Sequence, residues 1–182
     1  MKYLIISCSL NQNSKSRVLA KELLDKCNEL ELDIDFMDLQ DYKLPICDGS
    51  SCYSNPEVHK VFSKIQKAKG IILCTPVYNF YASSAAKNLI ELTGKDAWND
   101  KIVGFMCAAG GVSSYMSVMN LANSLMLDFR CVIIPKFVYA DRSKFGNVLD
   151  EDIKTRIGEL ADSFKNFVES LSLKRLEKSL MN

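Results

Sequence analysis

Residues 2–17 read KYLIISCSLNQNSKSR, and this stretch sets the pattern for the rest of the chain. Its first part, Lys2–Ser7, is a short apolar run of the kind that forms a strand buried on both faces. Its second part is polar and leads into a segment in which Leu19, Leu23 and Cys27 recur at helical spacing. A buried strand followed by a polar loop and an amphipathic helix is the typical opening of a parallel α/β sheet.

The same alternation continues as far as residue 171. Further strands are predicted at Asp33–Leu39, Gly70–Thr75, Lys101–Ala108 and Cys131–Phe137. Further helices are predicted around Val58–Ile65 and over Ser83–Thr93, Ser114–Asp128 and Glu151–Leu171. Five strands and five helices in strict alternation predict an α/β fold, in which helices cover both faces of a parallel sheet.

Size and composition predict one domain. The chain has 182 residues, of which 48% are hydrophobic, enough for a single full core. We expect this domain to span residues 1–171, with a helical or tail extension at 172–182. The net charge is +1 and neither sign forms a long block, so we expect no nucleic-acid partner. No apolar run reaches the roughly 18–20 residues that cross a bilayer, and we therefore expect a cytoplasmic protein with no membrane partner.

The cysteines and the histidine narrow the possible chemistry. The chain has 7 cysteines, an odd number, and most of them lie in or beside apolar runs, a pattern that indicates reduced thiols rather than a disulfide framework. The single histidine, His59, excludes metal sites and proton relays that need two, and we expect it to be a surface residue of the second helix. We expect no resident metal.

The loop after the first strand carries the strongest functional signal. Ligands of open α/β sheets bind beyond the carboxyl ends of the strands, where the strand order reverses. Between Ser7 and Arg17 this loop supplies short hydroxyls, amides and two cations, and it opens a helix whose first N–H groups are unpaired. The combination predicts a phosphate site, although simple N-capping would also use Ser or Asn. The loop is neither a GxGxxG fingerprint nor a P-loop, which argues against a Rossmann dinucleotide site and a nucleotide triphosphatase.

Two further loops are expected at the same edge of the sheet. The loop Thr75–Ser84 has three aromatic residues, Tyr78, Phe80 and Tyr81, which suit a flat, partly polar ring if they face solvent. The alternative is that this loop folds back on the core. In the loop Ala108–Tyr115, paired glycines permit a close approach of backbone to a ligand, or a positive φ.

In order and spacing these loops resemble the NADPH-dependent FMN reductases, flavodoxin-like oxidoreductases that include quinone, chromate and azo-dye reductases. Residues 9–17, SLNQNSKSR, resemble the family's phosphate loop, residues 75–79, TPVYN, resemble its TPEYN motif, and residues 86–89, AKNL, its following LKNA. Gly110 and Gly111 occupy the place of its glycine-rich loop. The resemblance extends from Met1 to about Phe137 and implies a three-layer flavodoxin-like fold, with a five-stranded parallel sheet in the order 2-1-3-4-5.

The resemblance also implies a cofactor and a set of site residues. FMN would be bound, its phosphate held by Ser9, Asn11, Ser14, Ser16 and Arg17. Its ring system would lie beside Pro76, Val77, Tyr78, Asn79 and Phe80, with Gly110, Gly111 and Ser113 on the other side. The cofactor carries the redox chemistry, so no side chain is expected to act as a catalytic acid or base.

The implied activity passes a hydride from NADPH or NADH through FMN to a small acceptor, such as a quinone, an azo compound, a metal oxyanion or free flavin. The family resemblance further implies a homodimer or homotetramer. A flavodoxin-like electron carrier, which binds FMN but serves protein partners, is the alternative. A near-neutral charge argues against this alternative, because flavodoxins tend to be strongly acidic. Lys87 and Asn88 are expected to serve helix packing or a subunit interface.

A final motif is the pair Cys47 and Cys52 in the loop Gln40–Asn55. Related iron–sulfur flavoproteins place a cysteine cluster in this loop, but two cysteines supply only half of the four ligands that a cluster needs. The pair is therefore interpreted either as two unpaired or transiently bridged loop thiols or as a redox-active disulfide.

Overall fold

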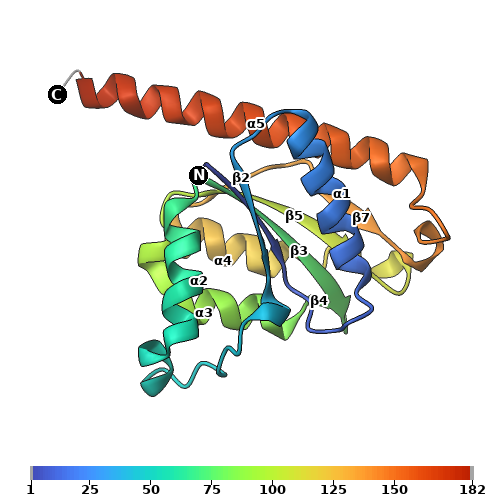
Figure 1. Ribbon diagram of the computed structural model, residues 1–182, viewed down its shortest axis with the longest axis horizontal. Helices are drawn as coiled ribbons and strands as arrows, with labels where there is room; N and C mark the ends of the chain where they lie inside the picture. Colours follow the sequence, from blue (N-terminus) through green and yellow to red (C-terminus); the bar gives the residue numbers. More distant parts are fainter. Residues whose placement is uncertain (1, 181–182) are drawn as a thin grey trace.

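The computed structural model describes residues 2–180 of the chain, with their side chains as far as Leu171. The strands are β1 Tyr3–Ser7, β2 Ile34–Asp38, β3 Gly70–Tyr78, β4 Tyr81–Ala82, β5 Ile102–Ala108, β6 Val132–Ile133 and β7 Val138–Ala140. The helices are α1 Lys15–Glu29, α2 Pro56–Lys67, α3 Ser84–Trp98, α4 Met119–Phe129 and α5 Glu151–Leu180. Figure 1 shows them as a three-layer α/β sandwich, which confirms the predicted fold class.

The central sheet runs in the order β2-β1-β3-β5-β6, and its neighbouring strands are parallel. Two further strands lie off this path: β4 forms a short antiparallel hairpin with β3, and β7 continues along β5 beyond β6. The described residues therefore form a sheet of 7 strands, which corrects the predicted number of five. The predicted order 2-1-3-4-5 agrees with the main path but does not include these two strands.

The last predicted strand, Cys131–Phe137, is broken in two. Ile134 still donates its N–H to the carbonyl of Val103, at 2.9 Å, but the next residue is Pro135, which has no N–H to give to β5. Pairing resumes only at Val138, opposite Met106. The interruption extends the strand beyond the predicted range and carries β7 to the carboxyl end of β5.

The two faces of the sheet are buried by different helices (Figure 1). One face packs against α1 and α5 through residues such as Leu19, Leu23, Ile157 and Phe164. The other face packs against α2, α3 and α4. Helix α5 lies close to the sheet because Gly70 has no side chain, and a Cβ at that position would collide with Phe164 and Val168.

Three helix predictions need correction at their ends. Helix α3 continues past Thr93 to Trp98 across a kink at Gly94, where φ is 59°, and the Trp98 indole N–H donates to Thr93 Oγ1 at 2.8 Å across this kink. Helix α4 begins at Met119 rather than Ser114, after a 3₁₀ turn. Helix α5 continues to Leu180, into the predicted extension; the side chains of residues 172–180 and all of residues 181–182 lie outside the described part. Within residues 2–180, no helix has both the length and the apolarity that a bilayer crossing requires.

Candidate active site

The strand register brings four loops to one edge of the sheet. Ser7 pairs with Cys74 across β1 and β3, Cys74 pairs with Met106 across β3 and β5, and Ala108 pairs with Ala140 across β5 and β7. Because parallel strands end on the same side, the loops that follow β1, β3, β5 and β7 all begin at this edge. The predicted meeting of three loops is thus a consequence of the register, and a fourth loop joins them.

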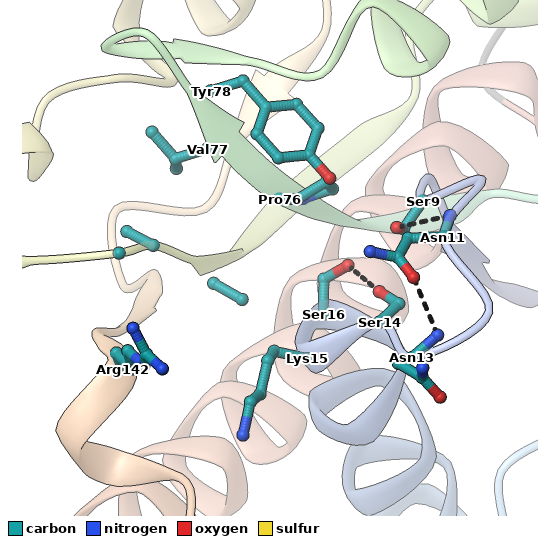
Figure 2. A pocket seen from close by; sticks show the side chains of 13 residues that line it. Ser9, Asn11, Asn13, Ser14, Lys15, Ser16, Pro76, Val77, Tyr78 and Arg142 are labelled. Atoms are coloured by element: carbon teal, nitrogen blue, oxygen red, sulfur yellow. Dashed lines mark hydrogen bonds between the residues drawn. The ribbon is translucent and has the colours of Figure 1, made fainter.

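A cavity of about 250 Å³ lies among these loops (Figure 2). Its lining consists of Ser9, Asn11, Asn13, Ser14, Lys15, Ser16, Pro76, Val77, Tyr78, Ala108, Ala109, Gly110 and Arg142. Figure 2 shows the polar loop and the start of α1 on one side of the cavity and residues 76–78 on the opposite side. Arg142 lies on a third side. Eight of the predicted cofactor residues are therefore brought together: Ser9, Asn11, Ser14, Ser16, Pro76, Val77, Tyr78 and Gly110.

The polar loop is shaped by its own side chains. Ser9 Oγ accepts the N–H of Asn11 at 3.3 Å, and Asn11 Oδ1 accepts the N–H of Asn13 at 2.9 Å. Ser14 is the N-cap of α1: its Oγ accepts the N–H of Arg17 at 3.2 Å and lies 2.9 Å from Ser16 Oγ. The N-capping alternative is thus correct for Ser14. The N–H groups of the first helical turn that this cap does not use, those of Lys15 and Ser16, remain available at the cavity.

Arg17 does not line the cavity. Its guanidinium pairs with the Asp38 carboxylate through Nε and Nη2, and both side chains are largely buried. Its remaining donors bond to main-chain carbonyls of the polar loop: Nη1 to Asn11 at 3.0 Å and Gln12 at 3.1 Å, and Nη2 to Ser9 at 3.2 Å. A guanidinium has five N–H donors, and these contacts engage all five. Arg17 therefore holds the loop from behind and has no donor left for a ligand.

A buried hydrogen-bond network joins the first loop to the second. Ser83, the N-cap of α3, donates its hydroxyl to the carbonyl of Cys8 at 2.9 Å and its N–H to Thr75 Oγ1 at 3.1 Å. Cys8 itself is fully buried, and burial, assisted by the charge of Asp38, raises the pKa of its thiol well above the ordinary value. Cys8 is therefore a neutral packing residue in this loop rather than a nucleophile.

The predicted loop Thr75–Ser84 is instead a hairpin, because β3 continues past Thr75 to Tyr78 and a tight turn leads from it into β4. Asn79 and Phe80 both have positive φ, 50° and 61°, as the turn between β3 and β4 requires. Tyr78 and Phe80 are exposed, at 54% and 67%, whereas Tyr81 packs against the core. The prediction of solvent-facing aromatics is therefore confirmed for two of the three. Asn79 and Phe80 lie outside the cavity lining, and Asn79 instead borders a neighbouring cavity of about 760 Å³ that shares Tyr78.

The third loop opens space without providing side-chain donors. Gly110 lines the cavity, and a Cβ there would meet no atom within 4 Å, so the missing side chain leaves room. Gly111 and Ser113 lie outside the lining; Gly111 is extended, with φ −160°, and its carbonyl accepts the Tyr139 hydroxyl. Neither glycine has the positive φ that the sequence left open. Because α4 starts only at Met119, its N-terminus is also farther along the chain than predicted.

The predicted site residues did not include five that line the cavity: Asn13, Lys15, Ala108, Ala109 and Arg142. Asn13 and Lys15 belong to the polar loop, and the composition of that loop was sufficient reason to include them among the site residues. The Lys15 ammonium lies 4.9 Å from the centroid of the Phe145 ring, which is a cation–π contact. Arg142 follows β7, and its only sequence signal is the pair of cations, Arg142 and Lys144, in a long loop.

The donor set fits a phosphate monoester that bears a planar group. Lys15, Arg142 and the N-terminus of α1 give the cavity a positive character, and neither its lining nor the first turn of α1 contains a carboxylate. Three serine hydroxyls add neutral donors. Pro76, Val77 and Tyr78 lie across from these donors (Figure 2), and together with Ala108–Gly110 they make the rest of the lining mostly apolar. A ligand with an anionic tail and a flat, partly polar ring matches both walls, and FMN has this form.

Comparisons with known proteins agree with this geometry. The sequence profile of the NADPH-dependent FMN reductase family matches residues 1–145. An NAD(P)H-dependent FAD/FMN reductase of Geobacillus thermodenitrificans is 29% identical over 88% of this chain and 90% of its own. An NADPH azoreductase of a Bacillus species is 26% identical over 92% of this chain and 93% of its own. An oxidoreductase structure from Corynebacterium diphtheriae, 17% identical, covers 93% of this chain and 98% of its own with a TM-score of 0.76.

Proposed function

The chain belongs to the NADPH-dependent FMN reductase family, and on that premise we propose that the cavity at the carboxyl edge of the sheet binds FMN. We propose further that the protein is an FMN-dependent NAD(P)H oxidoreductase that delivers the electrons to a small acceptor. The observation that carries the proposal is the donor set at the start of α1, which contains hydroxyls, free N–H groups and cations but no carboxylate. When bound, FMN supplies the hydride chemistry, which no side chain of the chain can supply itself.

The phosphate would be held at the start of α1. The N–H groups of Lys15 and Ser16 and the hydroxyls of Ser9, Ser14 and Ser16 are the donors, and the Lys15 ammonium supplies charge. Asn11 orders the loop through its contact with Asn13. Arg17 acts as a positioning residue: it fixes the loop carbonyls and thereby turns the donors toward the cavity.

The ring would lie between the second and third loops. Pro76, Val77 and Tyr78 form one side, and the open space at Gly110 forms the other. Asn79 and Phe80, together with Gly111 and Ser113, lie at the margins of this region in sequence, and we propose that they contact the ring's edge or the second substrate. The exposed Tyr78 and Phe80 leave the mouth of the cavity accessible to NAD(P)H and to an acceptor in turn.

The acceptor class follows from the relatives. Curated proteins similar to this chain are named for flavin, azo-compound or quinone reduction. We propose that this protein takes acceptors of the same kind, flat and conjugated, because the exposed aromatic ring of Tyr78 lines the cavity.

The remaining proposals concern the assembly and its setting. We propose a homodimer or homotetramer, supported by large apolar side chains left exposed near the site, among them Phe80 at 67%, Val112 at 73% and Met116 at 61%. The seven free cysteines support a cytoplasmic location, where thiols stay reduced. We assign the catalytic domain to residues 1–171 and regard residues 172–182 as an extension of it. Light scattering of the purified protein measures the assembly, and a monomer would contradict it.

The experiment that tests the function is anaerobic reduction of the FMN-loaded protein. Addition of NADPH or NADH is expected to bleach the flavin absorbance, and a quinone added afterwards is expected to restore it. A flavin that dithionite reduces but that neither pyridine nucleotide reduces would contradict the proposal and favour the electron carrier instead. A protein that binds no FMN would contradict both.

A further inference from the structure

The seven cysteines fall into two groups. Five of them, Cys8, Cys27, Cys74, Cys107 and Cys131, are at most 5% exposed within the main cores. Burial raises the pKa of Cys27 and Cys107 to about 12 and that of Cys131 to about 11. These thiols are chemically inert packing residues. The other two, Cys47 and Cys52, lie outside these cores in the loop between β2 and α2, and Cys47 alone among the seven is partly exposed.

The two loop thiols face each other. Cys52 Sγ lies 3.9 Å from Cys47 Sγ, within hydrogen-bond reach of it, and the Tyr53 hydroxyl lies 3.6 Å from Cys47 Sγ. A disulfide bond is about 2.05 Å long, so the sulfurs need to approach by only about 2 Å to bond. Side-chain rotation within a short loop provides a movement of that size.

The loop is built to keep the thiols together. The Asp48 carboxylate accepts three hydrogen bonds, from Ser50 N at 2.9 Å, Ser51 Oγ at 2.6 Å and Cys52 N at 3.1 Å. These bonds hold the pKa of Asp48 well below its ordinary value, so the carboxylate stays charged and the turn stays closed at neutral pH. Gly49, with φ of 71°, provides the left-handed residue inside this turn.

The same loop is anchored to α3. Asn88 Oδ1 accepts the N–H of Cys47 at 2.8 Å, and Asn88 Nδ2 donates to the carbonyl of Pro45 at 2.8 Å. The sequence predicted a packing or interface role for Asn88; the structure instead shows that it fastens the cysteine loop. Cys47 is thus held from both sides, by Asn88 at its backbone and by Cys52 and Tyr53 at its sulfur.

We propose that Cys47 and Cys52 are a redox-active dithiol that forms a reversible intramolecular disulfide when it meets a peroxide. The sulfur of Cys47, as its thiolate, attacks one oxygen of hydrogen peroxide; the O–O bond breaks, hydroxide leaves, and Cys47 becomes a sulfenic acid. The sulfur of Cys52 then attacks the Cys47 sulfur, the S–O bond breaks, and the oxygen leaves as water with the proton of Cys52. In sum, two thiols and one peroxide give one disulfide and two waters, and two electrons pass from sulfur to oxygen.

The order of the two thiols follows from their surroundings. Cys47 is partly exposed and can meet the peroxide, whereas Cys52 is only 4% exposed. Burial and the neighbouring Asp48 raise the pKa of Cys52, which makes it the less reactive thiol toward peroxide. Among the described residues, no group of three or more His, Cys, Asp or Glu side chains is placed to hold a metal ion.

A peptide map tests the proposal on the full chain. Both thiols fall in one tryptic peptide, residues 44–60, which contains no other cysteine. The folded protein is exposed to a small excess of hydrogen peroxide, denatured, alkylated and digested. The expected product is this peptide without alkyl groups and lighter than the dithiol peptide by two hydrogen atoms, while the other five cysteines are alkylated. Dithiothreitol added before alkylation should restore two alkylated sites.

Two matched variants assign the roles. With Cys52→Ser, Cys47 is expected to stop at the sulfenic acid, which dimedone traps; with Cys47→Ser, Cys52 is expected to remain alkylatable. Asp48→Ala, which opens the turn, is expected to slow disulfide formation about tenfold while leaving the five core thiols unreactive. Overoxidation of Cys47 without a bridge, bridges only between molecules, or no reaction at all would overturn the proposal. None of these outcomes depends on FMN, so this experiment tests the dithiol independently of the proposed enzyme activity.

Discussion

The loop after β1 and the loop after β5 begin at the same edge of the sheet but are stabilised in different ways. The first is held by the N-cap of Ser14, by the Ser9 and Asn11 side chains, and by Arg17 bound to Asp38. The second has no side-chain cap at either its 3₁₀ turn or α4, and it exposes Val112 and Met116. Preorganised donors suit the recognition of a fixed anion, whereas a donor-poor loop suits a ring that must stay accessible. The fold places both loops at this edge, but the first is held by its own side chains, whereas the second is held by the Tyr139 hydroxyl from β7.

The largest effect is expected from breaking the support of the first loop. Asp38→Asn and Arg17→Met each remove one partner of a pair whose side chains are only 11% and 13% exposed. Loss of such a pair should lower the free energy of unfolding by about 2–3 kcal/mol, near the lower end for buried pairs because some exposure remains. The loop carbonyls are then released, and the Kd for FMN should rise about a hundredfold. Chemical denaturation and flavin fluorescence titration measure the two effects.

The exposed pair of Lys136 and Glu159 gives the control for this comparison. Its side chains are 57% and 54% exposed, so Lys136→Met should change stability by less than about 1 kcal/mol and leave FMN affinity unchanged. Equal effects of Lys136→Met and Arg17→Met would show that the support of the loop has no special role.

A smaller effect is expected from the cap itself. Ser14→Ala removes the acceptor of the Arg17 N–H and one hydroxyl of the cavity, so stability should fall by about 1 kcal/mol. The Kd for FMN should rise about tenfold, since one donor to the phosphate is also lost.

Asn55→Ala is the matched variant for Ser14→Ala. Asn55 caps α2 through the N–H of Glu57 and does not line the cavity, so Asn55→Ala should lose similar stability with no change in FMN affinity. Parallel weakening of FMN binding in both variants would mean that Ser14 acts only through the helix.

A further effect is expected in the loop after β5. Gly110→Val places a Cβ where no atom lies within 4 Å, so the free protein should change in stability by no more than about 0.5 kcal/mol. FMN affinity should nevertheless fall several-fold, because the added carbons occupy space meant for the ring. Thermal unfolding without and with FMN separates these effects. Gly104→Ala should show the reverse, a loss of stability with unchanged FMN affinity. Its Cβ would collide with Ile72 in β3, which should destabilise the protein by about 1–3 kcal/mol. Unaltered FMN affinity in Gly110→Val would place the ring elsewhere.

The smallest effect at working pH comes from two buried thiols, one in each of the two cores that cover the faces of the sheet. Burial raises the pKa of Cys27 and Cys107 from 9.0 to about 12, so the unfolded chain releases these protons first. Their contribution to stability is complete below pH 9 and is lost as the pH rises toward 12. The unfolding midpoint should therefore show no change from these thiols between pH 6 and 8 and fall above pH 9. Cys107→Ala should reduce the alkaline slope, and an unchanged slope would contradict the assignment.

Most of the fold was predictable because it depends on local patterns. The apolar run of β1, the polar loop after it and the helical spacing of Leu19 and Leu23 are all contiguous in sequence. The start of α4 was not predictable in this way, because residues 112–114 form a 3₁₀ turn and the Tyr115 ring packs against Phe137 and Tyr139, which lie farther along the chain. The sequence did contain a signal for the break in the last strand, namely Pro135 within an apolar run. The β-rich residues on both sides of it nevertheless led to the prediction of one continuous strand.

The same distinction applies to the candidate site. The polar loop was identified from composition, but the role of Arg17 depends on Asp38, 21 residues farther along the chain. Arg142 reaches the cavity because Ala140 pairs with Ala108, and this register is a property of the assembled sheet. Side chains that act within one segment could thus be assigned from sequence, whereas those placed by distant partners could not.

The most direct test of the proposed phosphate site is a parallel titration of the flavin-free protein with FMN and with riboflavin. Quenching of flavin fluorescence reports the binding of each ligand. The two ligands share the ring and differ in the phosphate, which the start of α1 is proposed to bind. FMN is expected to bind about a hundredfold more tightly than riboflavin, as two or more charge-assisted hydrogen bonds to the phosphate imply. Equal affinities for the two ligands would contradict the proposed phosphate site.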